Sequence, residues 1–489
     1  MADLVATLVL VGHFGLLALL SIFGLYRLHL VGRHYRLRNR TRPPPKPLDE
    51  LPWVTVQIPL YNEPAVARRI IDAVASLDYP RSRFEIQVLD DSTDETSAMV
   101  RAAVRAHRAA GIRIEQIQRR HREGFKAGAL AEGLRRAKGE FVAIFDADFV
   151  PKPDVLRRAI HEFSDPEVGV VQMRWEHLNR GSSALTQIQA IRLDAHFGLE
   201  QEGRARAGLH LNFNGTAGIW RAATIRDAGG WQGDTLTEDL DLSYRAQLKG
   251  WRFVFRPDLV CPAELPEDYA AFRSQQHRWA KGATQVLRKL LGRVWRSHEP
   301  LRQKVETTFH LSANLAYLVM ILHATLFLVP SLVVRDVYQI RDTLWIDLPV
   351  LFFSSATHLW FFVTGQRATR RRLRASVRFL PALISIGIGL AVVEARACAE
   401  ALLGRRSEFV RTPKRGGSPQ GVFERAHPIG VLATAPEWFL ALGFGVALGW
   451  AAWVQLWGAT PFLLALHLGF LSSAWLLLRS RTHDVSSSA

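Results

Sequence analysis

The sequence is poor in cysteine. Its 489 residues include only two, Cys261 and Cys398, which lie far apart and form no C-x-x-C pair. Disulfide-rich scaffolds and cysteine-based zinc sites need several cysteines at short, regular spacing. The sequence therefore supports neither class, and we expect both thiols to be ordinary buried side chains.

Signals of two other protein classes are also missing. No G-x-G-x-x-G follows the first strand-like run, VTVQIPLYNE at 54–63, which argues against a nicotinamide or flavin enzyme. The net charge is +17, but the basic residues gather beside apolar runs and do not alternate with aromatic residues. We therefore predict no nucleic-acid partner, and a lipid bilayer as the surface that this charge borders.

Long apolar runs predict a membrane protein. The first, at 5–26, is followed by no small-residue cleavage site and is predicted to be a retained anchor. Arginines follow it directly, which places that side in the cytosol by the positive-inside rule. Further spans are predicted at 309–334, 347–365, 437–457 and 460–479.

The segment 379–403 is an exception. Its apolar run, 379–393, is short and gives way to charged residues from Glu394 onward. Arginine-rich stretches flank it at 367–378 and 405–415, and both flanks favour the cytosol. A segment with both ends inside does not cross, so we predict that it lies in the interface or re-enters.

These signals predict a multi-pass plasma (inner) membrane protein with a cytosolic α/β domain. The predicted parts are an N-terminal transmembrane helix at 1–30, a basic proline-rich linker at 31–50, the cytosolic domain at 51–265, an amphipathic interface helix at 266–300, two transmembrane helices at 301–366, an interfacial helix and loop at 367–430, two transmembrane helices at 431–480 and a tail at 481–489.

Acidic residues follow two predicted strands of the cytosolic domain. Strand-like runs alternate with helical runs, which is typical of a parallel sheet that binds ligands at the carboxyl ends of its strands. FEIQVLDD ends in Asp90 and Asp91, and VAIFDADF contains Asp146 and Asp148. Because residues i and i+2 of an extended segment project to one side, Asp146 and Asp148 can share one ligand, such as Mg²⁺ or Mn²⁺ on a substrate phosphate. An isolated D-x-D can also be a simple turn.

A third acidic motif, LTEDLDLSYRA, reads as the start of a helix. Thr237 is predicted to cap this helix, whose first turn carries Glu238 and Asp239. The functional interpretation makes Asp239 a general base that takes a proton from an acceptor hydroxyl. A plain helix start remains the alternative.

The fourth motif, SQQHRWAKG, places Gln275, Arg278 and Trp279 at helical spacing ahead of the predicted membrane. Arg278 can neutralise a diphosphate, and the Trp279 ring can stack on a sugar face. The alternative is a basic amphipathic helix on the bilayer surface.

In this order the four motifs resemble the processive family 2 glycosyltransferases, such as cellulose, chitin and hyaluronan synthases. The resemblance runs through about 50–415. VQIPLYNE, GFKAGAL, FNGTAGIWR and LKGW are most similar to the plant cellulose synthase-like mannan, glucomannan and xyloglucan-backbone glucan synthases. The resemblance implies an α/β GT-A-type (Rossmann-like) cytosolic glycosyltransferase domain inserted in an α-helical multi-span membrane domain.

The resemblance also implies an activity and roles for the matching residues. The implied reaction is inverting transfer of a hexose from GDP-mannose or UDP-glucose to a growing β-linked polysaccharide of the β-1,4 mannan or glucan type, with Mg²⁺ or Mn²⁺ as cofactor. The implied residues are Asp239, Asp148 and Asp146 for catalysis, the last two also for the metal; Asp90, Asp91, Glu63, Lys126, Glu238, Gln275, Arg278 and Trp279 for substrate binding; and Phe409, Thr412 and Lys414 of EFVRTPK for a gating loop.

The match departs from cellulose synthases at three positions. Asn214 stands where they usually carry a cysteine, Phe149 where they carry a histidine, and Arg411 where their gating loop has a valine. Cellulose itself is therefore disfavoured as the product. One alternative is a non-processive enzyme that adds a sugar to a membrane lipid. Another is a non-catalytic membrane protein, which the intact acidic motifs disfavour.

Overall fold

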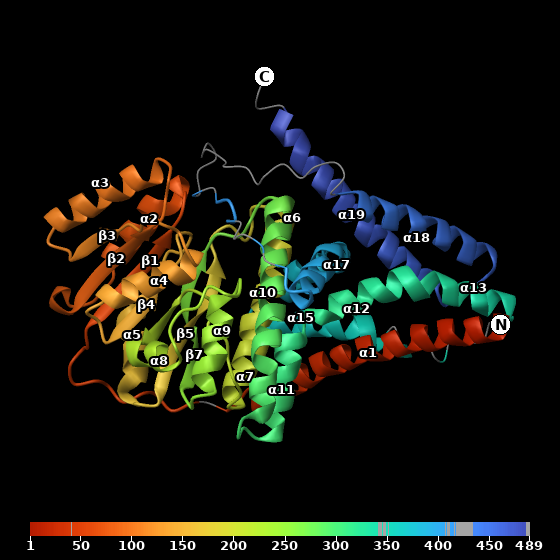
Figure 1. Cartoon of the computed structure of the whole chain (residues 1–489), viewed down its shortest axis with the longest axis horizontal. Coiled ribbons are helices and arrows are strands. Elements are labelled where there is room, and N and C mark those ends of the chain that lie inside the picture. Colours follow the sequence, from red (N-terminus) through yellow and green to blue (C-terminus); the bar gives the residue numbers. More distant parts are fainter. Residues whose placement is uncertain are drawn as a thin grey trace.

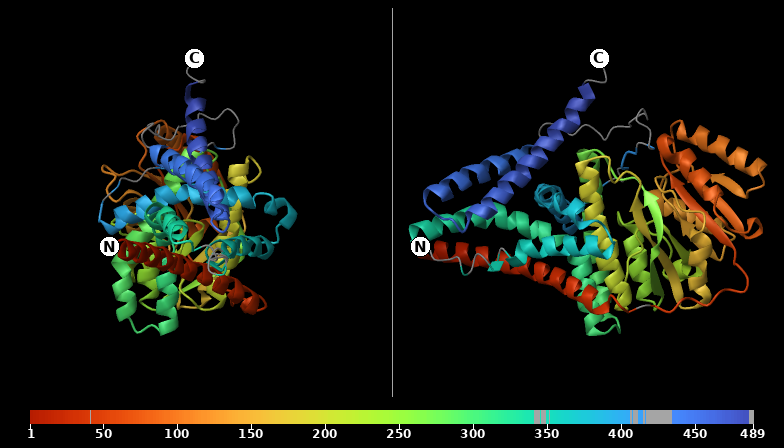
Figure 2. Two further views of the ribbon diagram at one scale, coloured as in Figure 1. Left: turned by 90° about the vertical axis from the view of Figure 1, so that its right-hand side faces the viewer. Right: turned by 180° about the vertical axis from the view of Figure 1, so that it is seen from behind.

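The chain forms a helix-covered sheet and a group of long helices that extends away from it (Figures 1 and 2). The computed structural model describes residues 1–40, 42–340, 345, 349, 350, 352–405, 407, 411–414, 416 and 434–485. Figure 1 shows the sheet at one end, the long helices at the other, and α6 and α10 between them. The predicted division into an α/β domain and a helical domain is visible in this arrangement.

The sheet has seven strands in the order β3-β2-β1-β4-β6-β5-β7. Their bounds are Val54–Leu60 for β1, Phe84–Asp90 for β2, Ile114–Ile117 for β3, Phe141–Ile144 for β4, Val168–His177 for β5, Gly218–Arg221 for β6 and Arg252–Ala263 for β7. Strands β1 to β4 pair in parallel, but β6 runs antiparallel to both β4 and β5. The prediction of a parallel sheet is therefore wrong for β6. A strand of four residues is too short to show its direction in a sequence pattern.

Helices cover both faces of the sheet and bury two apolar cores. Helix α2 begins at a proline, which fits the first helical turn, and buries Val66, Ile70 and Val74 on one side. Together with α3 and α5 it covers one face, while α4, α8 and α9 cover the other. The helices of this domain are α2 (Pro64–Ala75), α3 (Thr96–Ala109), α4 (Phe125–Arg136), α5 (Val155–Ile160), α6 (Ala184–Ala195), the π-helix η3 (His196–Gln201), α7 (Glu202–Arg206), α8 (Ala222–Asp227) and α9 (Glu238–Gln247), with short 3₁₀ turns η1 (Arg81–Arg83) and η2 (His161–Ser164).

A long helix, α10 (Tyr269–Arg296), links the sheet to the helical part. It begins where Asp268 accepts a hydrogen bond from the backbone N–H of Ala271 at 2.9 Å, and its bounds fall within the range 266–300 predicted to be helical. The remaining helices are α1 (Ala2–Leu37), α11 (Leu301–Ser312), α12 (Leu315–His323), the π-helix η4 (Ala324–Leu328), α13 (Val329–Val337), the π-helix η5 (Phe352–Ala356), α15 (Thr357–Ala368), α16 (Leu373–Val377), α17 (Leu380–Leu402), α18 (Ala435–Trp453) and α19 (Thr460–Val485).

Five helices in the described residues are long and apolar enough to cross a membrane. They are Ala2–Leu37, Leu315–Val337, Leu380–Leu402, Ala435–Trp453 and Thr460–Ser480. Four correspond to predicted spans. The fifth is α17, which we predicted not to cross, whereas the predicted span at 347–365 is not among them and lies partly outside the described residues.

The first helix is longer than the predicted span. It continues to Leu37, seven residues into the predicted linker, because no glycine or proline that would stop a helix occurs between Gly32 and the proline run that starts at Pro43. Its basic end packs against α7, where Arg206 donates to the backbone oxygen of Leu37 at 3.0 Å.

Candidate active site

A cavity of about 220 Å³ opens where β1, β2 and β4 end. It is lined by 12 of the 14 residues that the sequence singled out: Glu63, Asp91, Lys126, Asp146, Asp148, Glu238, Asp239, Gln275, Arg278, Trp279, Thr412 and Lys414. Asp90 does not line it, and Phe409 lies outside the described residues. The structure thus brings motifs that are up to 350 residues apart in sequence into one site.

The D-A-D motif lies two residues beyond the end of β4. Each aspartate contacts a lysine: Lys126 Nζ lies 2.6 Å from Asp146 Oδ1, and Lys414 Nζ lies 2.5 Å from Asp148 Oδ2. The backbone N–H of Asp146 also donates to the Thr216 hydroxyl at 2.8 Å. One oxygen of each carboxylate is therefore held by an ammonium group.

The two aspartates after β2 have different surroundings. Asp91 lines the cavity and receives Arg119 Nε at 2.9 Å. Asp90 is 1% exposed and accepts from the backbone N–H of Ser92 at 3.0 Å and from Gln116 Nε2 at 2.6 Å. Asp90 therefore holds the turn after the strand, and Asp91 is the member of the pair that can reach a ligand.

The T-E-D motif opens α9, as predicted, but without the predicted cap. Thr237 occupies the N-cap position, yet its side chain makes no capping hydrogen bond. Two glycines let neighbouring segments approach this turn: a Cβ on Gly282 of α10 would lie 2.5 Å from a Thr237 side-chain carbon, and a Cβ on Gly215 would lie 2.9 Å from Asp239 Oδ2. The FNGT turn and the QQHRW helix are thereby brought against Asp239.

Burial raises the pKa of several carboxyl groups in the cavity, and Asp239 is one of them. Burial, and next the neighbouring carboxylate of Glu238, raise the pKa of Asp239 to about 7. Burial likewise raises the pKa of Glu63 to about 7 and raises the pKa of Asp146 above its ordinary value. A carboxyl group that titrates near neutral pH in a cavity has the properties of a general base.

Asp241, the third carboxylate of LTEDLDLSYRA, is directed away from the cavity. Its side chain is fully buried and accepts from Arg245 Nε at 2.8 Å, and Lys289 Nζ lies 3.0 Å away. It does not line the cavity. Of the three carboxylates in this motif, Glu238 and Asp239 line the cavity and Asp241 does not.

The QQHRW motif lies on α10, with Gln275, Arg278 and Trp279 all on the cavity wall. The described part of the predicted gating loop packs over it. Arg278 donates to the Thr412 hydroxyl at 3.4 Å, and Arg411 lies 4.0 Å from Glu63. Lysine and arginine side chains therefore surround the D-A-D carboxylates from α4, α10 and the loop.

Several cavity residues were not singled out from the sequence. Trp175 and His177 lie at the end of β5 at positions i and i+2, the same spacing as the two aspartates of D-A-D. This spacing at a strand end is visible in the sequence and could have predicted that both residues face the cavity. Arg122 lies with its guanidinium 3.4 Å from the ring centroid of Tyr61, and both line the cavity. No motif marked this pair, because the two residues come from separate loops.

Comparison with known proteins identifies relatives of the domain that carries this cavity. Residues 52–282 match the family model described as "Glycosyltransferase like family 2". Over 251 residues the chain is 46% identical to glucomannan 4-beta-mannosyltransferase 2 of Arabidopsis thaliana, which covers 50% of this chain and 47% of that protein. It is 43% identical over 251 residues to glucomannan 4-beta-mannosyltransferase 1 of Oryza sativa subsp. japonica, covering 50% and 48%. The chain spans about half the length of the curated relatives that it matches.

A solved structure shares the fold. A mannosyltransferase from Pyrobaculum calidifontis, in complex with GDP-Man and Mn²⁺, superposes with a TM-score of 0.51 at 21% identity and covers 83% of this chain and 100% of that chain. The likeness confirms the predicted GT-A-type fold, with its mixed sheet. The family match identifies residues 52–282 of this chain as a glycosyltransferase family 2 domain.

Proposed function

We propose that the protein is a membrane-embedded inverting glycosyltransferase that extends a β-linked polysaccharide, of the β-1,4 mannan or glucan type, from a nucleotide sugar. The observation that carries the proposal is the convergence of D-A-D, T-E-D and QQHRW on one cavity. A base, a cationic wall and an aromatic ring for a sugar are the groups that such a transfer needs.

The donor is proposed to lie across the ends of β2 and β4. Glu63 follows β1 and Asp91 follows β2. Arg411 lies beside Glu63 and Arg119 beside Asp91, and these contacts would orient the two carboxylates toward the nucleoside. The diphosphate would lie near Lys126, Arg278 and Lys414, because these are the cations on the cavity wall beside D-A-D. Of the two candidate donors, GDP-mannose and UDP-glucose, the first is favoured by the mannosyltransferase names of the relatives and by the ligand of the solved structure.

The D-A-D carboxylates fit a divalent cation, Mg²⁺ or Mn²⁺. Such ions take hard oxygen ligands and are commonly held by one or two carboxylates plus substrate phosphates. The described residues contain no group of three or more acidic, histidine or cysteine side chains that would hold a metal alone, so phosphate oxygens would complete the shell. When bound, the cation would neutralise charge on the leaving diphosphate.

Asp239 is proposed to be the general base. Its carboxylate would accept the proton from the acceptor hydroxyl while that oxygen attacks the anomeric carbon, and Arg278 would stabilise the charge on the departing diphosphate. A single in-line displacement inverts the anomeric configuration, so an α-linked donor sugar gives a β-linkage. Trp279 would hold the terminal acceptor sugar by stacking.

The catalytic domain is proposed to face the cytosol of a multi-pass plasma (inner) membrane protein. The basic residues that border α1 and α17 support this side, since positive charge accumulates on cytosolic flanks. The lipid bilayer would surround the long helices that extend away from the sheet in Figure 1. The polysaccharide acceptor would then grow at the boundary between the two parts, where α10 lies.

Donor competition on purified membranes tests this proposal. Radiolabelled GDP-mannose and UDP-glucose are supplied in turn, each with an excess of the other unlabelled, and label is counted in polymer and in the lipid extract. We expect label from one donor in polymer. Label that stays in the lipid extract as a single sugar would instead support the non-processive lipid acceptor, and label in neither fraction would contradict the proposal.

A further inference from the structure

Three polar groups on one wall of the cavity lack a partner within the protein. They are Trp175 Nε1, His177 Nε2 and Asn214 Nδ2, each buried and without a hydrogen-bond partner among the described residues. All three residues line the cavity. Buried polar groups in native structures are nearly always hydrogen-bonded, so a cluster of unpartnered ones around a cavity indicates a ligand.

This polar wall lies on the other side of D-A-D from the proposed nucleoside site. In the strand order β3-β2-β1-β4-β6-β5-β7, the strand that carries Trp175 and His177 is two places beyond β4, whereas Asp91 follows β2. Asn214 comes from the turn before β6, and its backbone N–H donates to the side-chain oxygen of Gln172 of β5 at 2.9 Å. A donor that spans β2 to β4 leaves this wall for the other substrate.

The Asn214 side chain is held in one orientation. Its amide oxygen accepts from Asn212 Nδ2 at 2.7 Å and lies 3.1 Å from His196 Nε2. The carboxylate of Glu200 lies 3.3 Å from the other ring nitrogen of His196, so the imidazole is held between Glu200 and Asn214. With its oxygen engaged in this way, the amide directs its N–H groups elsewhere, and the unpartnered Nδ2 is the atom that a ligand can use.

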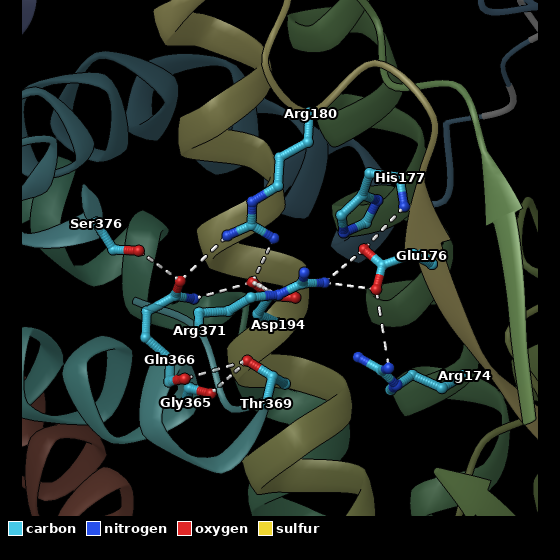
Figure 3. A network of polar contacts seen from close by, with 10 residues as sticks. All are labelled: Arg174, Glu176, His177, Arg180, Asp194, Gly365, Gln366, Thr369, Arg371 and Ser376. Atoms are coloured by element: carbon cyan, nitrogen blue, oxygen red, sulfur yellow. Dashed lines mark hydrogen bonds and ion pairs between the residues drawn. The ribbon is translucent and has the colours of Figure 1, made fainter. Parts of the chain in front are cut away.

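The strand end that carries the other two residues is also fixed. Figure 3 shows Arg371, from the connection between α15 and α16, reaching between the carboxylates of Glu176 and Asp194. Arg371 Nη2 lies 2.5 Å from Glu176, and Arg180 Nη1 lies 2.6 Å from Asp194. The Trp175 ring is held at 5.4 Å from that of Phe149 and from that of Phe197. The wall is therefore built before a ligand arrives.

The chemistry of the wall suits a neutral polyol. The indole and amide N–H groups can only donate, so they need ligand oxygens with lone pairs. Burial lowers the pKa of His177 to about 4, which leaves a neutral ring that can either donate or accept. The cations beside D-A-D, by contrast, come from α4, α10 and the loop. Sugar hydroxyl and ring oxygens match the wall, and a diphosphate matches the cations.

We propose that Trp175, His177 and Asn214 form a subsite that hydrogen-bonds the terminal sugar of the acceptor chain. The inference rests on the proposed transferase function and deepens it. It adds to the stacking proposed for Trp279 a second contact, directed at the hydroxyl edge of the sugar, so that the two together fix the attacking hydroxyl toward Asp239. His196 and Glu200 are positioning residues in this scheme, because they act through Asn214.

The test compares Trp175→Phe and Asn214→Ala with wild-type protein in detergent. Rates are measured with varied β-1,4-linked mannopentaose or cellopentaose at saturating donor. Each variant loses a neutral hydrogen bond of about 1 kcal/mol, so we expect KM for the acceptor to rise about 5- to 10-fold. Donor affinity, and release of nucleoside diphosphate without acceptor, should be unchanged.

Trp231→Phe is the matched control. The Trp231 indole N–H is also buried without a partner among the described residues, but it packs in the core beneath α4, α8 and α9 and not on the cavity. This control should keep the wild-type acceptor KM. An unchanged acceptor KM in both test variants, or an equal loss of donor affinity, would overturn the subsite while leaving the transferase proposal intact. Wild-type protein that transfers no sugar to any acceptor would overturn both.

Discussion

At the scale of single residues, the proposed chemistry depends most on Asp239. A base must be deprotonated, and the pKa of this carboxyl group is raised to about 7, first by burial and then by Glu238. Turnover should therefore rise with pH through about 7. Asp239→Asn should keep donor binding and lose about 10²- to 10⁴-fold in rate, as is typical when a general base is removed.

The neighbouring carboxylate of Glu238 determines the direction in which the pH–rate profile should shift when it is removed. Glu238→Gln removes a negative charge that disfavours ionisation of Asp239, so the acidic limb of the pH–rate profile should move to lower pH. Glu167→Gln, at a side chain that is 74% exposed, is the control and should leave the limb in place. A limb at the same pH in Glu238→Gln and wild type would mean that another group titrates.

Substitution of Asp148 tests the proposed binding of a divalent cation by the D-A-D motif. Asp148→Asn removes one of the two carboxylates proposed for the cation, so Mn²⁺ binding, followed by electron paramagnetic resonance with donor present, should weaken together with transfer. Asp154→Asn, an exposed aspartate six residues along, should behave as wild type. Full transfer in excess chelator, or normal Mn²⁺ binding by Asp148→Asn, would contradict the assignment.

At the scale of elements, Arg371 fastens the connection between α15 and α16 to the end of β5. Its guanidinium contacts Glu176, which is 23% exposed, at 2.5 Å, and lies 3.7 Å from Asp194. Arg371→Met removes hydrogen bonds to these charged groups, and we expect a loss of about 1–2 kcal/mol after allowance for solvent screening. The melting temperature of the detergent-solubilised protein should fall by a few degrees, whereas Arg367→Met, at an exposed position of α15, should leave it unchanged. Equal melting temperatures would show that the network adds nothing.

The elements also show how far the sequence predicts the site. A buried apolar run followed by carboxylates marked β2 and β4 correctly, because burial and strand ends leave a clear pattern. The sequence pattern does not show which of Asp90 and Asp91 faces the cavity. Adjacent residues at a strand end point to opposite faces, and the hydrogen bond from Gln116 to Asp90 decides which one faces inward. The missing Thr237 cap likewise follows from the close approach of Gly282, a contact between distant segments.

At the scale of the whole molecule, the contacts at the two ends of α17 bear on whether this helix crosses the membrane. Near its first end, Ser376 bonds to Gln366, which contacts Asp194 of α6. At its other end, Lys281 of α10 lies 2.8 Å from Glu400. Figure 1 also views α17 nearly end-on, whereas α1 and α19 run along the picture. Both ends thus meet the helices next to the catalytic domain, which supports the proposal that α17 does not cross.

Single cysteines test this topology. Ala375 and Leu403 are exposed and flank α17, and the native Cys261 and Cys398 are buried. In sealed cells, an impermeant maleimide applied from outside should label neither Ala375→Cys nor Leu403→Cys, and both should react after permeabilisation. Labelling of only one of them from outside would show that α17 crosses the membrane.

The linkage of the product tests the central claim most directly. Purified protein in lipid vesicles is given the radiolabelled donor and a divalent cation, and the product is digested with an endo-β-1,4-mannanase or an endo-β-1,4-glucanase. We expect a labelled polymer that one of these enzymes degrades to short oligosaccharides, and no polymer from Asp239→Asn. A product that resists both enzymes but yields to an α-specific glycosidase, or a polymer made at the wild-type rate by Asp239→Asn, would contradict it.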